Sequence, residues 1–343
     1  MRTYDPGRTV EHPGSEVHFP PLANGLDYVL SVVELLEAGT ERVSARDLKY
    51  AVLHLAAGVE VLLKARLQME HWALVFKDPA RAKRSELEDG TLNSCSPSEA
   101  VQRLRDIAGV AVSDKDAKAL ERLARHRNAL QHYGLIGPAA NARALESLAG
   151  EVLEFMVPFL AREVLSALSE DEYETFEEEF NRIRFGCHRI QGFVKKRMQR
   201  LSSVLTGQEY KTLRCPQCEQ WAFQPIHDEP GFDGMRCAFC AFIADPQTAA
   251  TEYALAVLRV GLQDLELGRR PVKWCPDCES PALIMGVFTA ADPEQPVNFC
   301  FACGAVVPDL FSCARCELPY RGPEKQSLCV ACSDRSADWE ELL

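Results

Sequence analysis

Apolar residues recur at intervals of three and four along the first half of the chain, the pattern of helices with one buried face. The longest pattern predicts a helix from about Ser44 to Phe76, with shorter helices near residues 26–37 and 98–107. Residues 1–21 hold four prolines and no periodic pattern, which predicts a flexible N-terminal arm. The apolar stripe of the long helix, which we expect to pack in a core, consists of Leu48, Val52, Leu55, Val59, Leu62, Ala65, Met69, Trp72 and Phe76.

Two further helices complete this part of the chain. One is expected from Ser113, a suitable N-cap, to about Tyr133. The next should run from the Gly-Pro pair that follows to about Leu168, with a kink at Pro158. Residues 22–168 are therefore predicted to be an all-α domain.

Beyond residue 210 the pattern changes to short strand-like segments separated by Cys, Pro, Gly and aromatic residues. Twelve of the 14 cysteines lie between Cys215 and Cys332, so this change in composition marks a domain boundary. The predicted fold class is mainly α: a helical bundle followed by small β-rich modules. After the bundle we expect a charged helical connector, a first cysteine module, a linking helix and two more cysteine modules, at residues 169–210, 211–245, 246–270, 271–306 and 307–343.

The twelve clustered cysteines form six Cys-x-x-Cys pairs, and no cysteine of that region is left over. Two residues between cysteines let both thiolates of a tight turn reach one tetrahedral ion, and two such turns complete a four-sulfur shell. We therefore expect three structural Zn²⁺ sites in zinc ribbons, with rubredoxin-like iron or redox dithiols as alternatives. Sequential pairing is the simplest arrangement, although the last two sites could be cross-braced. The predicted ligands are Cys215, Cys218, Cys237, Cys240, Cys275, Cys278, Cys300, Cys303, Cys313, Cys316, Cys329 and Cys332.

Composition and charge narrow the class of protein. The 343 residues are 47% hydrophobic and 26% charged, which is typical of globular domains. No apolar run approaches the ~18 residues of a membrane helix, and the first residues lack the apolar segment of a secretion signal. We therefore expect a cytoplasmic protein without a membrane partner, in a compartment that favours metal sites over disulfides. The net charge of −12 argues against a uniformly basic nucleic-acid binder.

The connector is divided by charge. Residues 170–179 hold seven acids and no base, whereas residues 181–200 hold seven bases and no acid. Two interpretations of the second stretch stay open: a solvated face neutralised by the acidic block, or a ridge that contacts RNA phosphates. A helix through this stretch would place four cations on one edge, namely Arg182, Arg189, Lys196 and Arg200.

The helix that ends near Tyr133 contains the sequence RNALQH at residues 127–132. Arg127 lies within the apolar stripe of this helix, where a charge is costly unless it is paired or used. His132 lies in the last turn, where the helix dipole favours a proton. The broken pattern at Arg127 therefore points to a functional site.

This stretch resembles the motif of the HEPN family, in which an arginine and a polar residue precede a histidine at the end of a helix in an antiparallel bundle. The long helix before it, with Glu60 and Lys64, is similar to the family's long helix with its glutamate-lysine pair. The resemblance covers about residues 22–168 and none of the cysteine-rich part. It implies a homodimer whose two motifs face each other across a cleft, and metal-independent RNA cleavage.

The resemblance also implies roles for three residues. Arg127 would stabilise charge on the phosphate, His132 would move the proton and Asn128 would orient them. The chain departs from family toxins that are neutralised by nucleotidyl transfer, because they carry a tyrosine two positions after the histidine and this chain has Tyr133 directly after it.

The function expected from these observations is a HEPN-type RNA endonuclease, similar to toxins or anti-phage defence proteins, whose zinc ribbons recruit RNA or a protein partner. The alternative is a non-enzymatic dimeric adaptor whose ribbons bind nucleic acid or protein. A third interpretation is a regulator that binds a nucleotide or a second subunit in the cleft. The sequence contains no Gly-rich phosphate loop, HExxH or GxSxG motif, which leaves NTPase, zincin and α/β-hydrolase functions without support.

Overall fold

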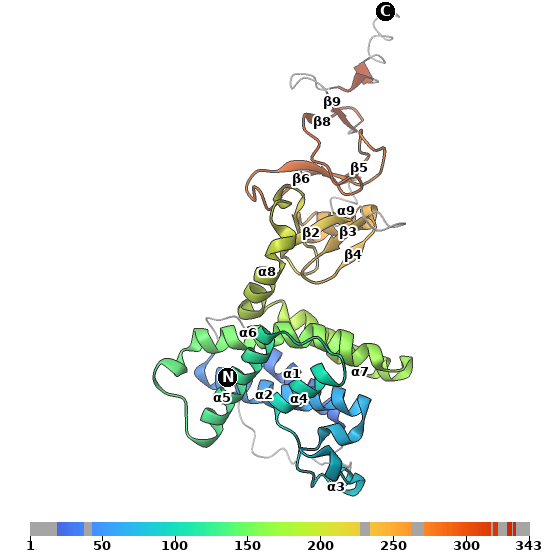
Figure 1. The fold of residues 1–343 in the computed structure, drawn as a ribbon. Coiled ribbons are helices and arrows are strands. Elements are labelled where there is room, and N and C mark those ends of the chain that lie inside the picture. The colour runs from blue at the N-terminus through green and yellow to red at the C-terminus, as the bar shows by residue number, and fades with distance from the viewer. Residues whose placement is uncertain are drawn as a thin grey trace, which may run out of the picture. The chain divides into compact units, whose positions relative to one another are not determined.

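The computed structural model describes residues 19–37, 43–226, 234–261, 271–316, 318–321, 328–330 and 332–333. The chain forms two compact units, the helical unit Met1–Lys196 and the ribbon unit Arg197–Leu343 (Figure 1). The helical unit is built from helices, and the ribbon unit carries three small antiparallel sheets. This confirms the predicted fold class. Among the described helices, none combines the length and apolarity needed to cross a bilayer.

The first two helices, α1 (Pro21–Leu36) and α2 (Ala45–Glu70), pack along each other (Figure 1). Most of the predicted N-terminal arm, residues 1–18, lies outside the described residues. A Cβ at Gly58 of α2 would lie 3.1 Å from Tyr28 Cβ, so glycine there allows the two helices to approach closely. The predicted apolar stripe is buried at Leu48, Val52, Leu55, Val59, Leu62 and Ala65, whereas Met69 is exposed.

The ends of α2 follow from local hydrogen bonds. At its start, Ser44 and Asp47 form a capping box. Hydrogen bonds from the Ser44 hydroxyl and backbone N–H lower the pKa of the Asp47 carboxyl. The helix ends at Glu70, earlier than predicted, because His71 is extended and its ring nitrogen accepts the backbone N–H of Ala73. A separate 3-10 turn follows, so the predicted helix to Phe76 is wrong in its last turns.

Three helices follow: α3 (Arg84–Glu88), α4 (Pro97–Asp106) and α5 (Asp114–His132). The sequence pattern does not predict the short α3. It does predict α4, within one residue at each end, and α5, which begins after the predicted N-cap Ser113. The structure adds that Ser96 is the N-cap of α4. Helix α5 packs against α2, α4 and α6 (Figure 1).

The next helix, α6 (Ala142–Phe159), contains Pro158 in its last turn, where the sequence predicts a kink. Proline has no N–H to continue the regular hydrogen-bond ladder. After it the chain widens into a π-turn, Leu160–Val164, and then tightens into a 3-10 turn, Leu165–Ala167. The helical segment thus reaches the predicted end, but its last two turns are not α-helical.

The connector consists of two helices, α7 (Glu170–Cys187) and α8 (Gln191–Leu205), instead of one continuous helix through the basic stretch. Helix α7 packs against α1. The start of α8 lies against α6, since a Cβ at Gly150 would lie 2.2 Å from the carbonyl carbon of Gly192. The connector therefore does not stand apart from the bundle, and the two compact units divide within α8.

Each predicted ribbon contains one antiparallel sheet, with four, three and two strands in turn among the described residues. The strands are β1 (Leu213–Arg214), β2 (Trp221–Ile226), β3 (Gly234–Cys237), β4 (Ile243–Ala244), β5 (Val272–Lys273), β6 (Leu283–Val287), β7 (Val297–Cys300), β8 (Leu310–Ser312) and β9 (Pro319–Arg321). Neighbouring strands are consecutive in the chain, so each sheet is a simple meander.

The first two ribbons pack together through α9 (Pro246–Ala256), which contacts both of their sheets. Its buried Tyr253 donates to the Phe288 carbonyl at 3.4 Å and accepts the Phe288 N–H at 3.3 Å. Burial raises the pKa of Tyr253 to about 12. The predicted linking helix is therefore a packed element but is shorter than predicted, because α9 ends at Ala256 and residues 257–261 are not helical; residues 262–270 lie outside the described residues.

Candidate functional site

Arg127 lies one turn before the end of α5, and its position in the apolar stripe is explained by an ion pair. Its Nη2 donates to Glu60 Oε2 on α2 at 3.2 Å, and its Nη1 donates to Gln131 Oε1 at 3.4 Å. The Arg127 side chain is 28% exposed, so the guanidinium is neither fully buried nor free in solvent. The positive charge of Arg127, which is unusual within an apolar stripe, is therefore paired with a carboxylate from another helix.

Glu60 connects Arg127 to a second cation. Its Oε1 lies 2.6 Å from Lys64 Nζ, and Lys64 also donates to the Ser94 hydroxyl at 2.8 Å. The glutamate-lysine pair predicted from the sequence is thus present, and it is extended by Arg127 and Ser94. Because one carboxylate faces two cations, the network keeps a net positive charge at this end of α5.

A groove of about 860 Å³ lies between α4 and α5 beside this network. Arg127 and Asn128 line it, together with Arg125 and the side chains of Val101 and Leu120. Its lining is therefore partly apolar and mixed in charge, since Asp106 and Glu121 line it along with three arginines. Volumes of a few hundred to a thousand cubic ångströms are typical of small-molecule sites, so the groove can hold a nucleotide-sized group.

His132 is the last residue of α5 and is exposed. Gly134, at φ 143°, donates its N–H to the Ala129 carbonyl at 2.6 Å and ends the helix as the sequence predicts. Within the described part of this one chain, no side-chain hydrogen bond joins His132 to Arg127 or Asn128. The residues that follow expose apolar surface, with Tyr133 87% and Ile136 72% exposed.

The twelve predicted metal ligands gather into three groups of four sulfurs, and within each group all Sγ atoms lie within 4.8 Å of one another. The groups follow the sequential pairing, which excludes the cross-braced alternative. Sγ···Sγ separations include 3.7 Å for Cys215–Cys240 and 3.6 Å for Cys278–Cys300. Tetrahedral Zn²⁺ with bonds of about 2.3 Å places its sulfurs about 3.8 Å apart, so the donor sets fit three structural zinc ions.

One turn geometry recurs around these cysteines. In five pairs, the carbonyl of the first cysteine accepts the N–H of the residue that follows the second, at 2.9–3.0 Å; in the pair Cys329/Cys332 this donor is Ser333. The donors in the other four pairs are Glu219, Ala241, Glu279 and Gly304, and these four have φ between 55° and 63°. A left-handed non-glycine residue costs about 1–2 kcal/mol, so three of these turns are held against their local preference. Gly304 is the one position where the sequence signals this conformation.

Backbone N–H groups also point at the sulfurs. Cys329 donates its N–H to Cys313 Sγ at 3.3 Å, which lowers the pKa of the Cys313 thiol to about 6. Donated hydrogen bonds of this kind favour the thiolate, the form that binds zinc. By contrast, burial raises the pKa of the isolated Cys187 thiol in the helical unit, which fits a structural role.

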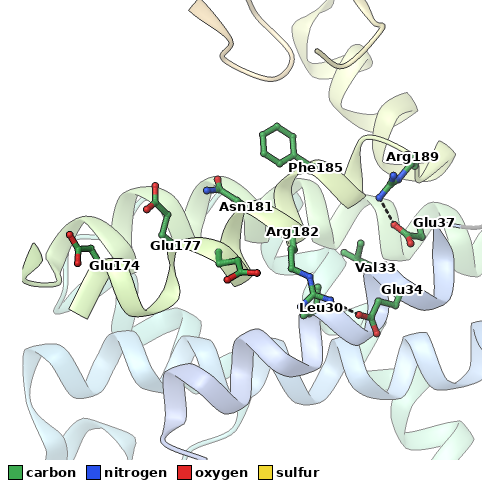
Figure 2. A pocket seen from close by; sticks show the side chains of 11 residues that line it. Leu30, Val33, Glu34, Glu37, Glu174, Glu177, Asn181, Arg182, Phe185 and Arg189 are labelled. Atoms are coloured by element: carbon green, nitrogen blue, oxygen red, sulfur yellow. Dashed lines mark hydrogen bonds and ion pairs between the residues drawn. The ribbon is translucent and has the colours of Figure 1, made fainter. Parts of the chain in front are cut away.

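The predicted basic edge is divided among α7, the turn that follows it and α8. Figure 2 shows Arg182 and Arg189 beside α1, where Arg182 lies 3.0 Å from Glu34 and Arg189 lies 2.8 Å from Glu37. The pocket there measures about 670 Å³ and is lined by glutamates as well as these arginines. The paired acids are therefore Glu34 of α1 and its C-cap residue Glu37, although glutamates of the acidic block line the same pocket.

The other two cations of that edge lie on α8. Lys196 is 3.4 Å from Glu151, and Arg200 belongs to the ribbon unit. The four cations do not form one helical edge, because the chain turns between α7 and α8. RNA contact by these residues stays a prediction that the geometry does not favour.

Comparison with models of protein families, with curated proteins and with solved structures found no match to this chain.

Proposed function

We propose that the helical unit is a HEPN-type, metal-independent RNA endonuclease that acts as a homodimer in the cytoplasm, in a role similar to toxins or anti-phage defence proteins. The zinc ribbons recruit RNA or a protein partner. The observation that carries this proposal is Arg127: its guanidinium is held by Glu60 at the edge of a groove, with Asn128 beside it and the exposed His132 just over one turn away.

This arrangement supplies groups that RNA cleavage needs. The reaction requires a base for the ribose 2′-hydroxyl, an acid for the leaving 5′-oxygen and positive charge beside the phosphate. Arg127 keeps N–H donors beyond the two that bind Glu60 and Gln131, and these can bind phosphate oxygens. Two His132 side chains across a dimer cleft can divide the acid and base roles.

The zinc ions have no direct part in this chemistry. A shell of four thiolates leaves no coordination position for water or substrate, so the ions would hold the ribbons in shape. The twelve ligands all belong to the ribbon unit, whereas the groups assigned to cleavage belong to the helical unit.

One observation favours a second function, the non-enzymatic adaptor. Arg127 is already bonded to Glu60 and Gln131, so a purely structural role would also account for its position. In that case the bundle would dimerise and the ribbons would recognise nucleic acid or protein.

Incubation of the purified protein with total RNA, beside Arg127→Ala and His132→Ala variants, separates the two functions. An enzyme should produce 2′,3′-cyclic phosphate ends and leave DNA intact, because DNA lacks the 2′-hydroxyl. The cleavage rate of each variant should be lower than that of the parent by roughly 10²-fold or more. If the parent cleaves no RNA, or if the variants cleave as well as the parent, the adaptor function is the better account.

A further inference from the structure

We infer that the exposed face of α5 is a binding track for the sugar-phosphate backbone of single-stranded RNA that leads to His132. This inference rests on the proposed function, since it assigns the surface that delivers the substrate. The track consists of four cations on one face of the helix, Lys115, Lys118, Arg122 and Arg125. None of them belongs to the basic edge predicted from the sequence.

Helical geometry aligns the track with the motif. Lys118, Arg125 and His132 are seven residues apart, so they lie almost directly above one another at steps of about 10 Å. Lys115 and Arg122 lie beside them on the same face. All four cations are exposed, as is His132. A strand bound along this face would therefore run toward the histidine.

The cations surround a hollow and are not scattered. Its volume is about 540 Å³, and it is lined by the four cations together with Glu121 and Glu151. Glu151 on α6 is 8% exposed, accepts a hydrogen bond from Arg122 Nη2 at 2.9 Å and lies 3.4 Å from Lys196. The buried carboxylate thus fixes Arg122 in place, while its own charge is balanced by Lys196.

The remaining cations of the track outnumber the one exposed acid, Glu121, that lines the hollow with them. Among the described residues, Lys115, Lys118 and Arg125 have no ion-pair partner. The acids at the start of α5 are occupied elsewhere: Asp114 pairs with Arg105 at 3.0 Å, and buried Asp116 accepts a hydrogen bond from Ser113 at 2.6 Å. In a chain with a net charge of −12, this face therefore keeps an excess of positive charge.

Continuity with the groove identifies the ligand. Arg125 lines both the hollow and the groove that contains Arg127 and Asn128. The hollow offers cations for phosphates, and the groove offers the buried apolar side chains of Val101 and Leu120 against which a base can lie. Only a strand with unpaired bases can use both surfaces, which favours single-stranded RNA over a duplex.

The test measures binding separately from cleavage. The full-length His132→Ala protein is titrated into fluorescein-labelled poly-uridylate, and anisotropy is read at several KCl concentrations. Adding Lys118→Gln and Arg125→Gln should weaken binding roughly tenfold to thirtyfold near 0.1 M salt and reduce the salt slope by about 1.4, as expected for two lost phosphate contacts on a single strand. The matched control is Arg81→Gln with Lys83→Gln, which removes the same charge from exposed positions after α2 and should change neither quantity.

The inference would be overturned by an unchanged salt slope in the Lys118/Arg125 variant, or by no binding of poly-uridylate to the His132→Ala parent. A parallel titration uses labelled polyglutamate. If the Lys118/Arg125 variant loses affinity only for polyglutamate, the face binds an acidic protein and the inference is also overturned. Unchanged helical ellipticity in all variants confirms folding. Failure of the proposed function looks different: the wild-type protein would cleave no RNA, while the α5 variant would still lose affinity and salt dependence. That combination would support the RNA-binding track and indicate that the protein binds RNA without cleaving it.

Discussion

Arg127 of α5 and Glu60 of α2 are joined by a 3.2 Å hydrogen bond, although they are 67 residues apart in the chain. If the guanidinium acts on the phosphate, Glu60 is the residue that positions it. Glu60→Ala should therefore lower the single-turnover rate of RNA cleavage by about 10-fold to 10²-fold, because a displaced group contributes less to the transition state. Glu60→Gln keeps an oxygen acceptor and should restore most of the rate. Equal activity of the alanine and glutamine variants would contradict a positioning role.

The zinc content gives a second prediction. Elemental analysis should find about three zinc ions per chain, one for each group of four cysteines. The third group is the least buried, with Cys316 exposed, so brief treatment with EDTA should remove one zinc ion before the other two. Cys316→Ser should purify with about two zinc ions and lose no more under the same treatment. Iron in place of zinc, or about one ion per chain, would contradict the assignment.

A cysteine variant tests whether the helical unit and the ribbon unit fold independently. Cys275→Ser should unfold its ribbon locally, because a zinc ribbon has little core of its own. The helical ellipticity should persist, since the helical unit has its own buried core. Loss of both signals together in the Cys275→Ser protein would show that the units fold as one.

The helical core could be predicted from the sequence where the local signals are strong. The caps at Ser44, Ser96 and Ser113 and the apolar stripe of α2 each determine an element by local chemistry. The local pattern does not predict the break between α7 and α8 at residues 188–190, nor the close packing of Gly192 against α6 that follows it, which is a tertiary contact.

The candidate site likewise combines features that the sequence predicts with features that depend on tertiary packing. Arg127 is conspicuous in the sequence because it violates the apolar pattern of its own helix, whereas its bond to Glu60 depends on how α2 and α5 pack. The α5 cations are missed because they occupy the exposed face, where charge is ordinary. The spacing of Lys118, Arg125 and His132 is the signal that was available. The left-handed turns after three of the Cys-x-x-Cys pairs carry no glycine to mark them.

The close contact between α6 and α8 gives a prediction about stability. An alanine Cβ at Gly150 would lie 2.2 Å from a backbone carbon of Gly192, so the two helices must move apart. Gly150→Ala should therefore destabilise the helical unit by about 1–3 kcal/mol, the usual cost of overpacking. Ser147→Ala on the same helix is only partly buried and should change the free energy of unfolding by less than about 0.5 kcal/mol. Urea denaturation followed by circular dichroism makes the comparison.

The proposed homodimer gives a prediction about oligomeric state. Tyr133 and Ile136 expose apolar side chains directly after His132, and a dimer with facing motifs would cover them. Light scattering should show a dimer at micromolar concentration, and Tyr133→Asp should shift it toward monomer. Phe185→Asp, which changes an exposed aromatic residue on α7, serves as the control and should leave the dimer intact. A monomeric parent protein would count against a site shared between two copies.

The basic edge predicted from the sequence gives the last test. Arg182 and Arg189 are already paired with Glu34 and Glu37, so their charges are largely offset before any ligand arrives. Replacing both with glutamine should change the stability by no more than about 1 kcal/mol per pair, because both arginines are exposed. The salt slope of poly-uridylate binding should stay the same, in contrast to the Lys118 and Arg125 substitutions. If the salt slope falls in the Arg182/Arg189 variant and not in the α5 variant, the RNA binds the face formed by α1 and α7 instead of α5.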